Sequence, residues 1–344
     1  MVKEIIKGSK LDTIHAKWEE LYIRGRDKWH YSFLQSYECA TMVMKSFYWH
    51  PLRWTYNPFF IYVKTNAGEA IFPLAISHNK KEIRDFYCFS PIDYIDFVTD
   101  ITDPIHLKAL FFECIKDYCD YQLTFTHFEE WSSIYSIFKN HGNLQKEICV
   151  QIILQEKSYD DYYKSLSKHQ RQNVRTAYNK LGKNNIALCV KEYDANNPVP
   201  FLIKKECQRI YEERCDIKNS HLKFKYLRKY WRRKAYFIND MIFLSSKRHT
   251  FVLFFDDTPV AFASGYFDDV SEIFYVPRLS TSERFLKYSA GIILVNEIVK
   301  ILIERDFHVF DLTRGMEPYK YAMGGAEHYT YYIHCGNNSL KLSL

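Results

Sequence analysis

Glycine, proline and paired cysteines are all scarce in this chain. Its 344 residues include 11 glycines and 10 prolines, which excludes long flexible or low-complexity segments. The nine cysteines stand singly, without a C-x-x-C pair, so we expect reduced thiols in a cytoplasmic protein and no metal site. No apolar run has the length of a membrane span, and the first ten residues lack the apolar stretch of a signal peptide.

Aromatic and apolar residues are abundant instead. Hydrophobic residues make up 47% of the chain and aromatic residues 17%, so a large core is available, and the length suits two domains of ordinary size. The net charge of +6 is compatible with anionic ligands such as a cofactor phosphate or tRNA, but it selects none of them. The composition leaves the oligomeric state open.

Two halves of the chain share one order of expected elements. Each half has three short strands joined by turns, flanked by helices. The expected strands cover residues 59–64, 70–77 and 83–89 in the first half, and residues 250–256, 260–267 and 271–276 in the second. This pattern predicts a mixed α/β fold of two tandem domains, with the boundary near residue 150. We also expect a helix over residues 159–181 and a basic helical region over residues 201–234.

The stretch 271–325 reads as strand, small-residue loop, helix and strand. Apolar residues recur with helical spacing from Ile292 to Leu302, and a second strand covers residues 307–312. The N–H groups that open such a helix have no intrahelical acceptor and suit a phosphate or pyrophosphate. A packing turn without a ligand is the alternative. The residues expected at the phosphate are Lys287, Tyr288, Ser289, Ala290, Gly291 and Ile292.

The residues after this helix add a more specific signal. The second strand continues as Asp311-Leu312-Thr313-Arg314-Gly315-Met316-Glu317-Pro318-Tyr319-Lys320. Together with the Tyr-Ser-x-Gly helix start, this resembles the CelD-like (BioF-like) branch of the GNAT acetyltransferase superfamily, which is related to the FemABX transferases. The resemblance implies two tandem GNAT-like domains, an acceptor-side domain at 1–150 and a donor-binding GNAT domain at 151–344. It also implies an N- or O-acyltransferase that uses acetyl-coenzyme A or another acyl-coenzyme A.

The same resemblance suggests catalytic roles. Asp311, or Glu317 through a water, would take the proton of the amine or hydroxyl acceptor. Tyr319 would protonate the departing thiolate. Arg314 and Lys320 would contact the substrate. For Asp311 we also weigh a simple ion pair with a neighbouring cation.

Two further motifs are candidates for substrate contact. The helix string from Leu166 to Arg175 is similar to one that opens the second domain of CelD-like proteins, and its matching residues are Arg171, Asn173 and Arg175. A solvated basic face is the alternative reading. In the first half, Asp93, Tyr94 and Asp96 resemble an Asp-Tyr-x-Asp turn and could hold the acceptor between the domains. Caps of a turn are the alternative role for these aspartates.

Two other functions remain open at this stage. The basic and aromatic residues at 201–234 favour a FemABX-like transferase that takes its group from aminoacyl-tRNA. An inactive GNAT pair that only binds a glycan, lipid or RNA is the other alternative.

Overall fold

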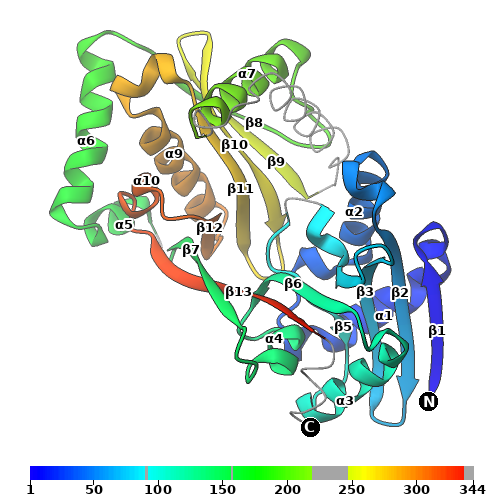
Figure 1. Cartoon of the computed structure of the whole chain (residues 1–344). Helices are drawn as coiled ribbons and strands as arrows, with labels where there is room; N and C mark the ends of the chain where they lie inside the picture. The colour runs from blue at the N-terminus through cyan, green and yellow to red at the C-terminus, as the bar shows by residue number, and fades with distance from the viewer. Residues whose placement is uncertain (90–91, 156–157, 219–246, 337–344) are drawn as a thin grey trace. The chain divides into compact units, whose positions relative to one another are not determined.

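The computed structural model describes residues 1–89, 92–155, 158–218 and 247–336 (Figure 1). By their contacts these residues form two compact units. Unit 1 comprises residues 1–148 and the segment after residue 328, and unit 2 comprises residues 149–328. The final segment belongs to unit 1 because its strand pairs with residues 122–129. The domain limits 1–150 and 151–344 stay a prediction about independently folding domains.

Unit 1 is built on a sheet with the strand order β1-β2-β3-β4-β6-β13. β4 and β6 run parallel, whereas β1–β2, β2–β3, β3–β4 and β6–β13 are antiparallel. Short β5 pairs with β3. The strands are β1 (Val2–Lys7), β2 (Asn57–Thr65), β3 (Gly68–Ser77), β4 (Glu82–Asp85), β5 (Val98–Thr99), β6 (Gln122–Glu129) and β13 (Ala326–Gly336). The α-helices are α1 (His15–Trp29), α2 (Tyr37–Trp49), α3 (Pro104–Cys114) and α4 (Ser133–Phe138).

Unit 2 repeats this plan with the strand order β7-β12-β11-β10-β9-β8. β11 and β12 run parallel, and the other neighbours are antiparallel. The strands are β7 (Gln145–Ile153), β8 (Leu188–Tyr193), β9 (Arg248–Phe255), β10 (Thr258–Asp268), β11 (Ile273–Thr281) and β12 (Val309–Arg314). The α-helices are α5 (Tyr159–Ser165), α6 (Lys168–Lys183), α7 (Phe201–Lys218), α9 (Ala290–Glu304) and α10 (Pro318–Tyr321).

Each unit therefore has an antiparallel meander, a crossover helix and a strand parallel to the last meander strand. In unit 1 these are β2-β3-β4, α3 and β6, and in unit 2 they are β9-β10-β11, α9 and β12. This is the order predicted for tandem GNAT-like domains, and the mixed α/β prediction is confirmed. The parallel pairs are possible because the crossover helices return the chain to the same sheet end.

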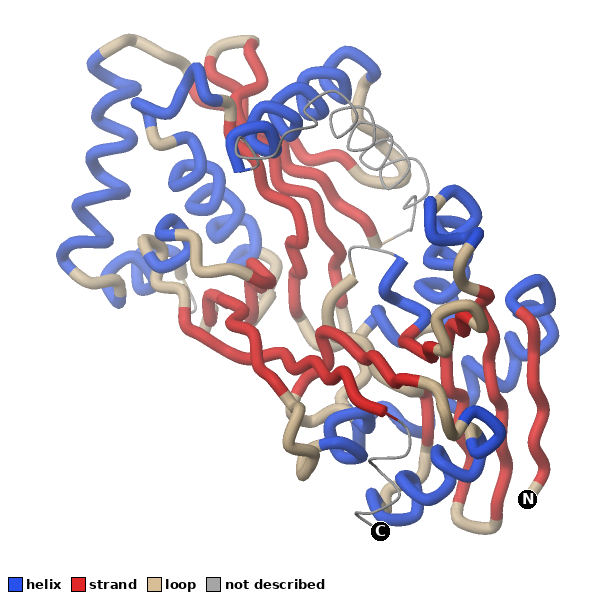
Figure 2. The backbone as a smooth tube through the Cα atoms, viewed as in Figure 1, coloured by secondary structure: helices blue, strands red, loops and turns tan. Residues whose placement is uncertain are grey.

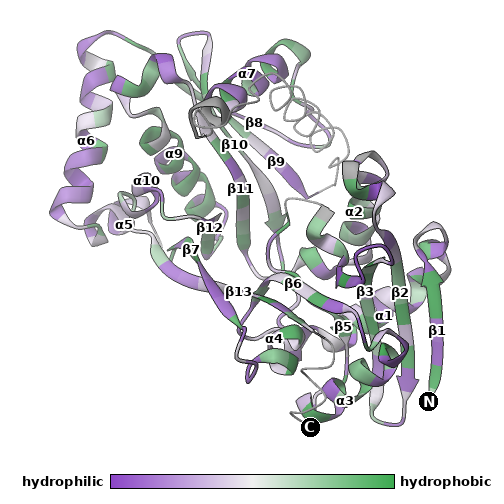
Figure 3. Cartoon of the chain, viewed as in Figure 1, coloured by the Kyte–Doolittle hydropathy of each residue, from purple (hydrophilic) through white to green (hydrophobic). Residues whose placement is uncertain are grey.

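The sheet of unit 2 lies between two layers of helix (Figure 2). On one face, Phe251, Leu253 and Ala263 pack in a large apolar cluster with α9, whose residues Ile293, Leu294 and Ile298 are fully buried. Figure 3 shows α9 as largely hydrophobic and α6, outside it, as mainly hydrophilic. On the other face, Val252, Phe254 and Phe262 pack with Cys207 and Ile210 of α7. We call this second side the α7 face.

Two expected elements differ from the structure. The helix expected over residues 159–181 is two helices, because Leu166 and Ser167 are extended and Ser167 caps α6. The strand expected over residues 83–89 ends at Asp85 and continues as a 3-10 turn. The hydrophobic pattern of the sequence did not predict β1 or β13. In β13 the burial pattern does not alternate cleanly, so no period of two marks it as a strand.

Candidate functional site

Strands β11 and β12 pair only over their first residues. The parallel register joins Ile273 with Val309, Phe274 with Phe310 and Tyr275 with Asp311, and it ends there. β12 also leaves its regular register with β7 between Asp311 and Arg314. The strands therefore part after Tyr275 and Asp311, near the middle of the sheet of unit 2.

A β-bulge in β11 lies at this parting point. Tyr266 of β10 faces Tyr275, and Ser264 faces Arg278, so Gly265 alone is opposite two residues of β11. A side chain at Gly265 does not fit, because a Cβ there would lie 2.0 Å from the carbonyl oxygen of Tyr275. A bulge bends its strand and is common beside functional sites. Here it turns β11 away from β12.

Helix α9 starts at the end of the loop that follows β11. Ser289 precedes the helix in the left-handed conformation, with φ 58°, and its side chain makes no capping hydrogen bond. By contrast, Ser167 of α6 accepts a hydrogen bond from the N–H of Gln170. The first N–H groups of α9 thus lack the side-chain acceptor that α6 has. Gly291 and Ile292 are half-buried at this end of the helix.

The other predicted phosphate residues have mixed surroundings. Ala290 is buried in the α9 cluster, and the ring of Tyr288 packs edge-on against Phe255 with ring centroids 5.8 Å apart. The Tyr288 ring is therefore part of the core. Lys287 is exposed, with its Nζ 4.9 Å from the centroid of the Tyr288 ring.

Lys180 is a residue of this region that the sequence motifs did not predict. It extends from α6, and its Nζ donates to the carbonyl oxygen of Lys287 at 2.8 Å. Two ammonium groups are therefore carried at the loop that leads into α9. Only the tertiary contact of α6 with residues 283–288 brings Lys180 there, so no local sequence signal could have found it.

The end of β12 holds a buried charged group. Asp311 is 2% exposed; its Oδ1 accepts from the N–H of Thr313 at 2.6 Å, and its Oδ2 lies 3.4 Å from Nε2 of His328. His328 is a second residue that the sequence motifs did not predict. Asp311 therefore lies next to the parting point with both oxygens engaged by groups of its own unit.

Lys320 has a structural position rather than the predicted substrate contact. It is 2% exposed, and its Nζ donates to the carbonyl oxygens of Thr313, Arg314 and Gly315 at 3.1, 2.7 and 3.0 Å. Burial lowers the pKa of the Lys320 ammonium, and the nearby Glu317 carboxylate opposes that shift. The ammonium closes the turn that follows β12.

Three more predicted site residues lie in or beside this turn: Glu317, Tyr319 and Arg314. Oε2 of Glu317 is 3.2 Å from Nζ of Lys320. Tyr319 is partly buried against the α9 cluster, and half-buried Arg314 is the last residue of β12. The structure brings all three within a few residues of Asp311 along the chain, and their roles stay predictions.

Arg171 also has a structural role where a substrate contact was predicted. Its Nη1 donates to the carbonyl oxygens of Lys164, at 2.8 Å, and of Leu166. These are carbonyls at the end of α5, which the helix itself leaves without partners. In the same helix Gln170 donates to the carbonyl oxygen of Tyr321 at 2.7 Å. The string resembling the CelD-like helix thus joins α5, α6 and the turn after β12.

The other two residues of that string are more open. Asn173 is half-buried and Arg175 is exposed. Arg175 makes no ion pair with any residue in the described part of the chain. They remain predictions for substrate contact.

The Asp93–Asp96 turn lies in unit 1 and is buried. Asp96 is 4% exposed, and its carboxylate accepts hydrogen bonds from the N–H groups of Phe97, Ser133 and Ile134 and from the Ser133 hydroxyl. Burial raises the pKa of Asp96 to about 7, although these hydrogen bonds oppose the shift. Asp96 therefore caps α4, which was the alternative reading, and we no longer assign it to the acceptor.

Asp93 and Tyr94 of the same turn are buried as well. They are 6% and 2% exposed, and Tyr94 has φ 65°. The carbonyl oxygen of Tyr94 accepts a hydrogen bond from Gln35. A contact of either residue with an acceptor stays a prediction.

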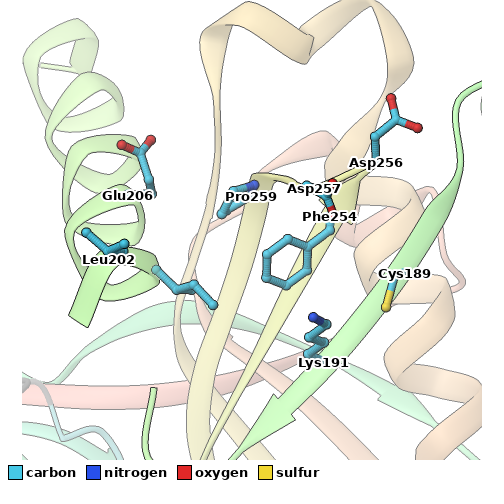
Figure 4. Close-up of a pocket in the computed structure, with 9 residues that line it drawn as sticks. Cys189, Lys191, Leu202, Glu206, Phe254, Asp256, Asp257 and Pro259 are labelled. Carbon is cyan, nitrogen blue, oxygen red and sulfur yellow. The ribbon is translucent and has the colours of Figure 1, made fainter. Parts of the chain in front are cut away.

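A separate pocket of about 400 Å³ opens on the α7 face of unit 2 (Figure 4). Phe254, Pro259 and Leu202 form its apolar part, and Lys191 and Glu206 bring opposite charges to its rim. The pocket lies at the end of β9 remote from Arg248, where β9 turns into β10. It is therefore distinct from the point where β11 and β12 part.

Among the described residues, no three His, Cys, Asp or Glu side chains gather closely enough for a metal ion. In the same ranges, no helix combines the length and the apolar content that a membrane crossing requires. The basic residues at 219–234, which favoured a tRNA-dependent enzyme, lie outside the described residues.

Comparison with known proteins agrees with this geometry. Residues 168–321 match the family model described as "Acetyltransferase (GNAT) domain". This match confirms, over this part of the chain, the resemblance to the GNAT acetyltransferase superfamily that the sequence predicted. A search of the curated proteins finds no match to the chain.

Solved structures match over nearly the whole length. The structure of FemX is similar with a TM-score of 0.56 and 12% identity, and each chain is covered to 100%. A tandem GNAT protein from the clavulanic acid biosynthesis pathway is similar with a TM-score of 0.55 and 9% identity, covering 98% of this chain and 99% of that one. A conserved protein of unknown function from Bacteroides thetaiotaomicron has a TM-score of 0.55 and 13% identity, with 97% and 98% covered. At these identities the likeness shows the tandem GNAT fold alone.

Proposed function

We propose that unit 2 transfers an acyl group from an acyl-coenzyme A to an amine or hydroxyl acceptor. The observation that carries the proposal is the parting of β11 and β12 beyond Tyr275 and Asp311, within a segment that matches a GNAT domain. Parallel strands that separate in mid-sheet leave backbone groups that an extended thioester arm can pair with. The family match makes acetyl-coenzyme A the first donor to test.

The start of α9 supports the position of the donor's pyrophosphate. The N–H groups of Ala290 and Gly291 lie at the helix end that carries partial positive charge, and Ile292, whose N–H donates to the carbonyl oxygen of Ser289 at 3.0 Å, lies beside them. Lys180 and Lys287 add two ammonium groups at the same loop. A pyrophosphate there would meet backbone donors and counter-charge together.

The proposed reaction is a direct attack on the thioester. The acceptor's nitrogen or oxygen bonds to the carbonyl carbon, the carbon–sulfur bond breaks, and coenzyme A leaves as a thiolate that takes a proton. The acceptor's own proton must go to a base. Asp311 is the last residue of β12 that pairs with β11, and this position supports it as the base. Glu317, acting through a water, is the second candidate. Tyr319 is the proposed acid for the thiolate.

Titration calorimetry with acetyl-coenzyme A tests the donor assignment. At Gly291 an added Cβ would meet Thr281 at 3.2 Å, whereas at Gly182, in the helix α6, it would meet nothing within 4 Å. Gly291→Trp should therefore abolish binding, and the matched Gly182→Trp should retain it. Equal affinity in a folded Gly291→Trp protein would overturn the assignment.

The same preparation separates the alternatives. A donor at a hundredfold its dissociation constant should add about 2.7 kcal/mol to the free energy of unfolding. Stabilisation by charged tRNA but not by acetyl-coenzyme A would favour the aminoacyl transferase. Stabilisation by acetyl-coenzyme A without turnover of any amine or hydroxyl compound would favour a binding protein.

A further inference from the structure

Strand β8 forms one edge of the unit 2 sheet. Within the described residues only β9 pairs with it. The N–H of Asp256 donates to the carbonyl oxygen of Ala187, just before β8, at 2.8 Å, so Ala187 directs its backbone groups toward β9. This direction alternates along an antiparallel strand. Every second residue of β8 therefore directs its N–H and C=O groups away from β9, and these residues are Leu188, Val190 and Glu192.

Two of these residues present their backbone groups to a neighbouring strand. The carbonyl oxygen of Glu192 accepts from the Asn197 side chain at 3.4 Å, which leaves Leu188 and Val190. Their side chains are half-buried and pack against the apolar cluster of α9. A strand edge of this kind is a template for pairing with another strand. The edge of β8 therefore suits a strand with apolar side chains on the α9 side.

The pocket on the α7 face carries unbalanced negative charge beside this edge (Figure 4). Asp256, Asp257 and Glu206 line it with a single cation, Lys191. Glu206 is paired with Arg209 at 2.8 Å, and Oδ1 of Asp256 accepts from a backbone N–H at 3.0 Å. Neither Asp257 nor Lys191 forms an ion pair with a residue in the described ranges. The pocket thus offers carboxylates to an incoming cation, and β8 offers an exposed ammonium.

A second copy of β8 meets both requirements in one antiparallel register. A twofold axis through the pair of Cys189 residues sets Leu188 of each copy opposite Val190 of the other, so apolar side chains meet on the α9 side. On the α7 face it sets Lys191 opposite Ala187, which is bonded to the Asp256 turn. Strands lie about 4.8 Å apart, so this turn is roughly 10 Å from the incoming strand. An extended lysine side chain covers most of that distance.

The register shifted to an axis at Val190 fits less well. It sets Leu188 opposite Glu192, so an apolar side chain meets a charged one. It also requires the Glu192 carbonyl, which already accepts from Asn197. An axis at Lys191 would place two ammonium groups directly opposite each other, which is destabilising. The axis at Cys189 is the arrangement that the side chains and the backbone both favour.

We propose that β8 pairs with β8 of a second copy of this chain across a twofold axis at Cys189. Each Lys191 then enters the pocket of the other copy, where its ammonium meets the carboxylates of Asp256 and Asp257. Its methylene groups lie along Phe254 and Leu202, the apolar part of that pocket. The pairing joins two unit 2 sheets into one continuous sheet.

Oxidation with copper phenanthroline tests the register. Cysteines opposite each other in a non-hydrogen-bonded pair have Cα atoms about 4.5 Å apart, which permits a disulfide, whereas diagonal neighbours at roughly 7–8 Å cannot be bridged. Wild-type protein should form a covalent dimer that a reducing agent separates, and Cys189→Ser should form none. Cys119→Ser removes a half-buried thiol of unit 1 and should leave the dimer unchanged. No covalent dimer of wild type, or an equal yield from Cys189→Ser, overturns the inference.

Exchange of charges tests the lysine contact. Analytical ultracentrifugation measures the dissociation constant of the dimer. Lys191→Glu and Asp257→Lys each turn two attractions per dimer into repulsions, so either change should raise this constant about tenfold. Both changes in one chain should restore it, and Lys183→Gln, which removes an exposed cation of α6, should leave it unchanged. A monomeric wild type, or a double variant no tighter than the single ones, overturns the inference.

Discussion

The Nζ atom of Lys320 lies 3.1 Å from the carbonyl oxygen of Thr313, seven residues earlier in the chain. Thr313 has φ 55° and Gly315 has φ 105°, so the backbone turns sharply out of β12. Two more carbonyls, of Arg314 and Gly315, point at the same ammonium. The Lys320 side chain thus donates hydrogen bonds to the carbonyl groups at the end of β12, the strand that carries Asp311.

Lys320→Met should therefore destabilise unit 2. The change leaves three carbonyl oxygens without their common donor, and the expected loss is about 3 kcal/mol in the free energy of unfolding. Urea denaturation measures it. Lys164→Met removes an ammonium whose side chain is 76% exposed and should stay within about 0.5 kcal/mol of wild type. A folded Lys320→Met protein of wild-type stability with weakened substrate binding would restore the substrate role.

Arg171 and Arg175 should behave differently although they share α6. Arg171→Ala removes the donor to the carbonyls of Lys164 and Leu166, so we expect a loss of about 1–3 kcal/mol. Arg175→Ala removes an exposed charge and should change stability by less than about 0.5 kcal/mol. Thermal melts of the two variants, compared with their donor affinities, test this. Equal melting temperatures would contradict the capping role.

The Glu192 carboxylate should stabilise the folded protein at neutral pH and lose this effect in acid. Burial would raise the pKa of this carboxyl, but hydrogen bonds from His249 and Arg305 lower it to about 2 from 4.5. A carboxyl whose pKa is lower in the folded state stabilises fully above its unfolded value and loses this contribution as the pH falls through the folded value. The difference in unfolding free energy between wild type and Glu192→Gln should therefore be constant near neutral pH and shrink from pH 4.5 toward pH 2. A difference that does not change over this window would contradict the shift.

Calorimetry should find one donor molecule per chain. In unit 1 the helix α3 occupies the place in chain order that α9 has in unit 2, but the Asp103 carboxylate accepts from the N–H groups of Ile105 and His106. This carboxylate occupies the position that a phosphate would take, and its negative charge would repel a phosphate. Past the parallel pairing of β4 and β6, the N–H of Ile95 also donates to the carbonyl oxygen of His127 on β6, so the chain itself fills this place. A stoichiometry of two acetyl-coenzyme A per chain would show that unit 1 is open.

Local chemistry in the sequence determined most elements and the fold class. Val174, Ala177 and Leu181 recur with helical spacing and are the buried residues of α6. The paired meanders, each with its crossover helix, predicted the tandem GNAT-like fold that the structure and the comparisons confirm. These features depend on the order of residues along one element, which a sequence displays directly.

The roles of the charged residues were decided by the tertiary structure. A sequence shows that residues 96, 171 and 320 carry charge, but not which groups they meet. Asp96 meets the start of α4, Arg171 the end of α5 and Lys320 the turn after β12. Each satisfies backbone groups that a helix or strand leaves unpaired at its end. The place of Lys180 at the loop before α9 depends on a contact between separate elements, because only folding brings charges from different parts of the chain together.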